Sequence, residues 1–326
     1  MKVLITGGAG FIGSNFARMA AKGEFDGIEE IVILDKFTYS GVRSNLNFAA
    51  ALTNVSILEG DICNPMDCAN ALIGVNAVIN FAAESHVDRS ISNASEFLNT
   101  NVIGVQILLD QIKLIDNSIR FVQISTDEVY GSITQGSWTE SSELHPNSPY
   151  SASKASAELI ALSYHRTHKI DVVITRSSNN YGPNQFPEKL IPLFITNLLE
   201  NEKVPIYGSG ENIRDWLHVD DHCYGIYKVL TKGKSGEVYN IGGGLELSNL
   251  NLADLILEVL GKDRNFLEFV EDRKGHDFRY SLDWSKIERE LGYFPRVSFD
   301  KGLIQTINWY IQNDEWWRPL VLGKLR

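Results

Sequence analysis

The sequence predicts an α/β protein: a doubly wound parallel sheet with a smaller C-terminal domain interleaved with it. Short apolar runs rich in β-branched residues alternate with longer helical patterns as far as about Arg176, after which the rhythm changes. A glycine-rich turn directly follows the first apolar run. Strands that are apolar throughout and alternate with helices are typical of a parallel sheet covered on both faces, with right-handed crossovers.

The expected elements follow from these patterns in chain order. Strands are predicted at residues 2–6, 30–34, 55–59, 77–81, 120–124 and 172–175. Helices are predicted between them at 11–21, 41–52, 65–73, 96–115 and 149–168. Farther along we expect a helix at 188–199, strands near 205–207 and at 238–241, and helices at 251–260, 285–291 and 302–313. The aromatic residues expected to pack onto the second part are Trp309, Tyr310, Trp316 and Trp317.

Two domains are expected from the 326 residues, since a domain commonly takes roughly 150. The chain shows no internal repeat and no low-complexity linker, so the domains are interleaved rather than consecutive. We expect residues 1–178 to form the first domain, with 215–243 returning to it. Residues 179–214 and 244–326 then form the second domain.

Charge and cysteine content exclude several classes of protein. The 30 Lys and Arg against 41 Asp and Glu leave a net charge of −11, which argues against binding to nucleic acid or to an anionic membrane. Three cysteines without a CxxC pair indicate a reducing compartment, with Cys63, Cys68 and Cys223 as packing residues. The N-terminus lacks a signal-peptide pattern and no apolar stretch approaches the ~20 residues of a membrane helix. We expect a cytoplasmic protein.

The glycine-rich turn is a candidate dinucleotide site. Gly7, Gly10 and Gly13 follow the spacing GxxGxxG, directly after the first predicted strand and at the start of the first helix. Gly7 permits the tight turn, Gly10 lets the backbone approach a pyrophosphate, and Gly13 allows close packing of helix and strand. The helix N-terminus, with Phe11 and Ile12, offers free N–H groups to the phosphates. A glycine-rich turn without a ligand is the alternative.

An acidic residue at the end of the second strand favours NAD over NADP. Asp35 lies 22 residues beyond Gly13, where a carboxylate bonds the adenosine ribose 2′-hydroxyl and repels a 2′-phosphate. Asp61 follows the third strand, where an adenine-contacting loop is expected, although it equally suits an N-cap before Pro65. The residues expected around the adenosine are Asp35, Lys36, Thr38, Asp61 and Ile62.

Tyr150 and Lys154 are the first candidate catalytic pair. They lie four residues apart and therefore share one face of the helix predicted at 149–168. The ammonium of Lys154 could lower the pKa of the phenol and hold the nicotinamide ribose, so that Tyr150 exchanges a proton with a sugar hydroxyl while hydride moves to NAD. A YxxxK pattern alone occurs by chance in many helices, so its place after a glycine-loop domain carries the hypothesis.

This pairing resembles the extended short-chain dehydrogenase/reductase family. The run Ser-Thr-Asp-Glu-Val-Tyr-Gly at 125–131, with adjacent Asp127 and Glu128, resembles the nucleotide-sugar 4,6-dehydratase branch of that family. The resemblance implies a Rossmann-type sheet and a lyase that holds NAD tightly. It also implies dTDP-glucose as the substrate, with oxidation at C4, loss of water across C5 and C6, and hydride return to C6.

The resemblance also implies a role for each carboxyl. Thr126 is a hydrogen-bonding residue near the nicotinamide, Glu128 is the base at C5, and Asp127 is the acid at the C6 hydroxyl. The two carboxyls must then hold different protonation states. Because neighbouring side chains on a strand point opposite ways, we expect the chain to leave the sheet and turn at Thr126. A solvated acidic turn is the alternative.

The remaining site residues are implied by the same resemblance. Those expected at the cofactor, besides the glycine-rich turn and the adenosine residues, are Ala82, Ala83, Ser85, Thr100, Tyr150, Lys154 and Asn180. Those expected at the nucleotide sugar are Ser85, Thr126, Asn179, Glu188, Lys189, Leu190, Tyr207, Arg214, Asn249, Arg273 and His276. Arginine suits a diphosphate because its planar fork donates two parallel hydrogen bonds, although for a single arginine a surface ion pair is commoner.

Two other functions are the alternatives to a dehydratase. A UDP-sugar 4-epimerase would do without Asp127 and Glu128, and a non-catalytic nucleotide sensor would not need to retain the catalytic residues. The pairs His165/His168 and His218/His222 have helical metal spacing but no third ligand, so we expect no metal.

Apolar residues beyond the needs of one sheet face, together with the resemblance, predict a homodimer through a four-helix bundle. These residues are Val102, Val105, Leu108, Leu109, Leu159, Ile160 and Leu162.

Overall fold

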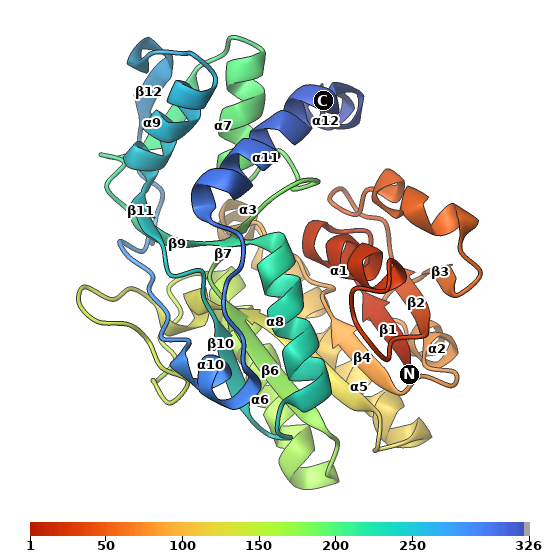
Figure 1. The fold of residues 1–326 in the computed structure, drawn as a ribbon. Helices are drawn as coiled ribbons and strands as arrows, with labels where there is room; N and C mark the ends of the chain where they lie inside the picture. The colour runs from red at the N-terminus through yellow and green to blue at the C-terminus, as the bar shows by residue number, and fades with distance from the viewer. Residues whose placement is uncertain (323–326) are drawn as a thin grey trace.

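The computed structural model describes residues 1–322 and contains one large parallel sheet with a smaller part at one end of it (Figure 1). The large sheet has the order β3-β2-β1-β4-β5-β6-β10. Its strands are β1 (Lys2–Thr6), β2 (Glu30–Asp35), β3 (Val55–Glu59), β4 (Ala77–Asn80), β5 (Arg120–Thr126), β6 (Val172–Ser177) and β10 (Val238–Ile241). The doubly wound sheet predicted from the sequence is confirmed.

Helices cover both faces of this sheet because its strands are apolar on both sides. Val3 and Ile5 of β1 pack in one core with α1 (Phe11–Ala21) and α8 (Val219–Lys232), whereas Leu4 packs in the other. The second core contains α2 (Pro65–Ala71), α5 (Gly104–Ile115) and α6 (Pro149–His168). Figure 1 shows α1 and α8 on the near side of the sheet and α5 and α6 behind it. Alternation of side chains along a strand accounts for this division.

The predicted strands lie within about two residues of the observed ones, and β10 pairs in parallel with β6, so the chain does return to the large sheet. Two predicted helices are wrong in detail. The segment at 41–52 is a 3₁₀ helix, η1 (Arg43–Ala51), held to the glycine-rich turn by a hydrogen bond from the Asn45 side chain to the Ala9 carbonyl. The segment at 96–115 consists of α4 (Ala94–Leu98), a π turn η2 (Asn99–Ile103) and α5.

The π turn has a local physical reason. It turns Asn101 inward, where the amide accepts from the backbone of Glu84 at 2.8 Å and donates to the Ser153 hydroxyl at 2.8 Å. A Cβ on Gly104 would lie 2.7 Å from the Ile62 side chain, so only glycine permits this close approach. Single π turns are frequent at functional sites, and this one carries Thr100.

The smaller part has two small sheets. One contains β7 (Asn179–Tyr181), β9 (Ile213–His218) and β11 (Glu246–Ser248), and the other pairs β8 (Val204–Tyr207) with β12 (Leu267–Val270). Its helices are α7 (Leu190–Leu199), α9 (Asn249–Val259), α11 (Phe299–Gln312) and α12 (Asp314–Leu322), while α10 (Ser285–Leu291) lies against β10. Tyr310 and Trp317 are buried in its core, so the aromatic end packs as predicted. The elements α8, β7, β9, β11 and β12 were not predicted from the sequence.

The apolar residues assigned to a dimer face behave differently from the prediction. Val105, Leu108 and Leu109 are at most 1% exposed, because they pack in the second core of their own chain. The prediction that they exceed the needs of one sheet face is therefore wrong. Exposed apolar side chains in this region are Leu98, Ile103 and Leu159, with exposed fractions of 51%, 44% and 59%.

Two further sequence expectations concern the cysteines and membrane segments. Cys68 and Cys223 are buried and all three cysteines are free thiols, which fits packing residues. Among the helices of residues 1–322, none has both the length and the apolar composition that crossing a bilayer requires.

Candidate active site

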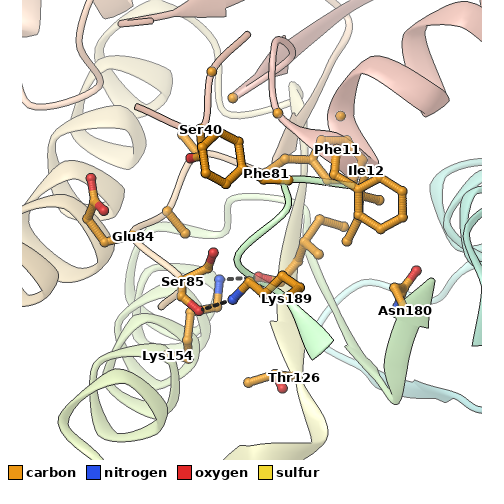
Figure 2. Close-up of a pocket in the computed structure, with 18 of the residues that line it drawn as sticks. Phe11, Ile12, Ser40, Phe81, Glu84, Ser85, Thr126, Lys154, Asn180 and Lys189 are labelled. Carbon is orange, nitrogen blue, oxygen red and sulfur yellow. Dashed lines mark hydrogen bonds between the residues drawn. The ribbon is translucent and has the colours of Figure 1, made fainter. Parts of the chain in front are cut away.

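The candidate site lies at the carboxyl edge of the large sheet. Strand order reverses between β1 and β4, and ligands of doubly wound sheets bind in the crevice at such a switch point. A cavity of about 340 Å³ opens there, lined by the chain where β1, β2, β4, β5 and β6 end. Every residue expected to contact the cofactor lines this cavity. Figure 2 shows Phe11 and Ile12 toward one end and Thr126 and Lys154 toward the other.

The glycine-rich turn forms a backbone cradle. Gly7 has φ +66°, and a Cβ there would lie 2.6 Å from the backbone nitrogen of Ala82 on the neighbouring strand connection. A Cβ on Gly13 would overlap the carbonyl oxygen of Gly7. The first N–H groups of α1, whose N-cap is Gly10, lack intrahelical partners, and no side chain of residues 1–322 caps this helix N-terminus. These features fit the diphosphate of a dinucleotide.

Asp35 is held in place for hydrogen bonding at the end of β2. Its carboxylate accepts from the backbone N–H groups of Ala9 at 2.8 Å and Phe37 at 2.7 Å. Burial raises the pKa of Asp35, and these two N–H groups act in the opposite direction. Because a carboxylate has about four acceptor sites, capacity remains for ribose hydroxyls. Lys36 and Asp61 form an ion pair at 2.9 Å beside it.

The carboxyl pair lies on a turn that begins where β5 ends. Thr126 is the last residue of β5 and the N-cap of a short 3₁₀ helix, η3 (Asp127–Tyr130). Its hydroxyl accepts from the backbone N–H of Glu128 at 3.3 Å and donates to Asp127 Oδ1 at 3.1 Å. The predicted departure from the sheet at Thr126 is therefore confirmed. Asp127 Oδ2 is buried without a hydrogen-bond partner among residues 1–322.

The surroundings of the two carboxyls differ. Burial raises the pKa of Asp127 well above its usual range, and the charges of Glu128 and Asp215 raise it further. Burial also raises the pKa of Glu128, but three cations oppose this effect. The cations are Arg273, Lys189 and Arg214. The pKa of both carboxyls is raised, but the site favours the protonated form more strongly for Asp127 than for Glu128, whose ionised form the three cations support.

Tyr150 and Lys154 lie on the first turns of α6. Ser148 caps this helix through a reciprocal capping box with Ser151, which fixes where it begins. Burial raises the pKa of Tyr150, Glu128 and Asp127 raise it further, and a hydrogen bond with Thr126 lowers it.

The ammonium of Lys154 donates to the carbonyl of Ile124 at 2.6 Å, and burial lowers its pKa to about 8. The hydrogen bond with the Thr126 hydroxyl lowers the pKa of Tyr150. That Lys154 also lowers the pKa of Tyr150 stays a prediction.

The residues expected at the sugar fall into two groups. Ser85, Thr126, Asn179, Glu188, Lys189 and Leu190 line the cavity. Lys189 crosses it and donates to the backbone carbonyl of Ser85 at 2.7 Å (Figure 2). The carboxylate of Glu188 accepts from the Tyr39 hydroxyl at 3.0 Å. The other five, Tyr207, Arg214, Asn249, Arg273 and His276, lie outside the cavity lining.

Arg214 and Arg273 nevertheless lie on the Glu128 side of the cavity, since both act on the pKa of Glu128. The Arg214 guanidinium lies 4.4 Å from the centre of the Tyr280 ring and donates to the Asp277 carbonyl at 2.9 Å. His276 packs edge-on against Tyr207, with ring centres 6.2 Å apart.

Sequence reasoning missed several lining residues. They are Leu34, Ser40, Gly41, Gly60, Phe81, Glu84, Ile124, Ser125, Ser177, Ser178, Gln185, Phe186, Ile191 and Trp216. Five of them lie at or directly after the carboxyl end of a predicted strand, which was an available signal: Leu34, Gly60, Phe81, Ile124 and Ser125. Trp216 lies on β9, an element that the sequence analysis did not predict.

Comparison with known proteins agrees with this geometry. A sequence model described as GDP-mannose 4,6 dehydratase matches residues 4–306. The chain belongs to this family of nucleotide-sugar dehydratases. A dTDP-glucose 4,6-dehydratase of Streptomyces niveus is 52% identical over 322 residues, which cover 98% of this chain and 96% of that protein.

Related enzymes of similar structure have been solved with NAD bound. The dTDP-glucose 4,6-dehydratase DesIV from Streptomyces venezuelae, solved with NAD and TYD bound, has a TM-score of 0.97 and 55% identity, covering 98% of this chain and 100% of that one. A Bacillus cereus UDP-glucuronic acid 4-epimerase, solved with UDP-glucuronic acid and NAD, has a TM-score of 0.89 and 30% identity, covering 96% and 99%. The resemblance noted from the sequence is confirmed, and NAD is the cofactor.

Proposed function

We propose that the protein converts dTDP-glucose to dTDP-4-keto-6-deoxyglucose as a 4,6-dehydratase with tightly bound NAD. The observation that carries this proposal is the pair Asp127 and Glu128 on a buried turn, with Tyr150 close enough for both carboxyls to act on its pKa. A 4-epimerase has no use for an acid and a base at C6 and C5. A carboxyl that burial favours as neutral, next to one whose ionised form three cations support, suits elimination of water.

Each group has one task in the proposed reaction. Bound NAD supplies the hydride acceptor and donor. Tyr150, as the phenolate that the Thr126 hydrogen bond supports, takes the proton of the C4 hydroxyl as the C4 hydride departs. Glu128 takes the proton from C5, which the C4 ketone has made acidic, and Asp127 gives its proton to the C6 hydroxyl, which leaves as water. When hydride returns to C6, Glu128 gives a solvent-exchanged proton back to C5, and solvent takes the proton from Tyr150 and restores the one on Asp127.

In this proposal, each of the two parts of the chain binds one of the two ligands. Residues 1–178, with 215–243, bind NAD, and residues 179–214 with 244–326 bind the nucleotide sugar. The glycine-rich turn and Asp35 support the first assignment, and Arg214 and Arg273 near Glu128 support the second. The boundary at residue 215 falls inside β9, so this strand joins the two ligand sites.

We also propose a homodimer formed through α5, α6 and the π turn before α5. Leu98, Ile103 and Leu159 are exposed on elements that pack together, which leaves an apolar surface on this face. Light scattering should give a dimeric mass, and Leu159→Asp should give a monomer. Leu322→Asp, on an exposed side chain of α12, is the control and should leave the mass dimeric. A monomeric wild-type protein at micromolar concentration would contradict the proposal.

The decisive test of function uses dTDP-glucose in D₂O without added NAD. We expect a product that has lost one water and carries deuterium at C5, detected by mass spectrometry. A product of unchanged mass would indicate an epimerase, and no product with either dTDP-glucose or UDP-glucose would indicate a non-catalytic protein. Parallel reactions with the two nucleotides establish which base the enzyme prefers.

A further inference from the structure

Residues 182–188, which connect β7 to α7 within the smaller part, lie beside the cofactor cavity. We call this segment the strap. Gln185 and Phe186 of the strap line the cavity, and Thr38 and Ser40 of the connection after β2 line it from the large-sheet part. Tyr39 lies between these last two residues, and none of the roles described above uses it.

Tyr39 fastens the strap at its C-terminal end. Its hydroxyl donates to Glu188 Oε1 at 3.0 Å, and its ring packs edge-on against Phe186 with ring centres 5.5 Å apart. The side chain of Glu188 is only 5% exposed, so this hydrogen bond is shielded from water. A bond to a buried carboxylate contributes more than one between neutral groups.

Arg89 strengthens this fastening from the segment after β4, on α3 (Val87–Ser92). Its guanidinium carbon lies 3.7 Å from the centre of the Tyr39 ring, and its Nη2 lies 3.5 Å from Glu188 Oε2. One arginine therefore contacts both partners of the hydrogen bond, by a cation–π contact and by charge. His86 Nε2 lies 3.7 Å from the same carboxylate oxygen.

A second fastening holds the other end of the strap. Asn184 donates to the side-chain oxygen of Asn45 at 3.1 Å, and Trp316 of α12 donates to the same oxygen at 3.0 Å. Asn45 in turn donates to the carbonyl of Ala9 in the glycine-rich turn at 3.0 Å. The strap is thus tied at both ends to the residues that surround the dinucleotide.

We propose that the strap is a clasp that retains NAD, and that Tyr39 and Arg89 are the positioning residues that keep it closed. A hydride that leaves C4 and returns to C6 restores the cofactor within each turnover, so NAD has no reason to leave between reactions. The strap must open for NAD to leave. Arg214 and Arg273 lie on the Glu128 side of the cavity, whereas Glu188, which ends the strap, and Lys189, which follows it, are also expected at the sugar. Retention of NAD is therefore tested without sugar.

The test measures release of NAD in the absence of any sugar. The holoenzyme is loaded with radiolabelled NAD and diluted into excess unlabelled NAD, and the label retained on the protein is followed in time. Tyr39→Phe removes only the hydroxyl, and we expect release about tenfold faster than in wild type. Arg89→Gln should also accelerate release. The double variant should fall short of the product of the two effects, because both changes open the same contact.

Tyr227→Phe is the matched control. The Tyr227 hydroxyl donates to the backbone carbonyl of Asp26 at 3.1 Å, outside the cavity lining. This variant should release NAD at the wild-type rate. For Tyr39→Phe and Arg89→Gln, kcat with saturating NAD and sugar should stay within about twofold of wild type, which separates retention from catalysis.

Faster release of NAD from Tyr39→Phe and Arg89→Gln would support the proposal. Release at the wild-type rate from both variants would overturn it. Should Tyr39→Phe fold poorly, Arg89→Gln carries the test, since the Arg89 side chain is 48% exposed and tolerates replacement. Because no sugar is present, the outcome does not depend on which nucleotide sugar the enzyme uses.

Discussion

Arg176 of β6 and Glu158 of α6 form a buried, bidentate ion pair: Arg176 Nε lies 3.1 and 3.0 Å from the two carboxylate oxygens. The same guanidinium donates to the Tyr130 hydroxyl at 2.6 Å. Glu158 lies one helical turn after Lys154, and Tyr130 ends the turn that carries Asp127. The pair therefore joins the two elements that bear the proposed catalytic groups.

Breaking this pair should destabilise the protein strongly. Arg176→Met leaves the carboxylate of Glu158 buried without its partner, and we expect a loss of about 3–5 kcal/mol in the free energy of unfolding, measured in urea. Replacing both residues, Arg176→Met with Glu158→Leu, should restore part of that loss, since no buried charge remains. Equal losses in the single and double variants would contradict this account.

Removing the charge of the two carboxyls should block loss of water without blocking oxidation at C4. With Asp127→Asn and Glu128→Gln together, we expect oxidation at C4 to proceed and loss of water to fall by at least about 10²-fold. The readouts are reduced-nicotinamide absorbance after mixing with dTDP-glucose and product mass. Tyr150→Phe is the contrasting variant, in which oxidation itself should slow. Normal water loss in the double variant would overturn the assigned roles.

Lys154 should make stability depend on pH in a defined window. Burial lowers its folded pKa from 10.5 to about 8, so between these pH values the unfolded chain binds more protons and stability rises with pH. Wild type should therefore gain up to about 3 kcal/mol relative to Lys154→Met between pH 8 and 10.5. Urea unfolding at both ends of the window measures the gain. A difference in stability that stays constant over this window would show that folding does not lower the pKa of Lys154.

Alanine substitutions at Gly10 and Gly13 of the cradle should affect stability and NAD affinity differently. A Cβ on Gly13 would lie 3.0 Å from Gly8 Cα and overlap the Gly7 carbonyl, whereas one on Gly10 meets only that carbonyl, at 3.3 Å. Gly13→Ala should therefore lower both the melting temperature and NAD affinity. Gly10→Ala should lower NAD affinity by at least about tenfold while the melting temperature falls by only a few degrees. Calorimetric titration of NAD into stripped protein distinguishes the two.

Much of the fold could be predicted because its signals are local. An apolar run such as residues 2–6 and the turn at Gly7 are visible within a few residues of sequence, and β1 begins and ends as predicted. The helix at 41–52 was predicted wrongly because its conformation depends on Asn45 bonding to Ala9, a contact between segments. The short strands β7, β9 and β11 escaped prediction because each is stabilised by pairing with distant partners.

The sequence by itself determined the positions of the strands in the first half, the glycine-rich turn, the departure from the sheet at Thr126 and the adjacent carboxyls that follow it. Only the tertiary structure decided how these groups behave. The raised pKa of Asp127, the cations around Glu128 and the use of Glu188 by Tyr39 depend on residues from five or more separate segments. Burial and Coulomb interactions are set by neighbours in space, which a linear pattern does not specify.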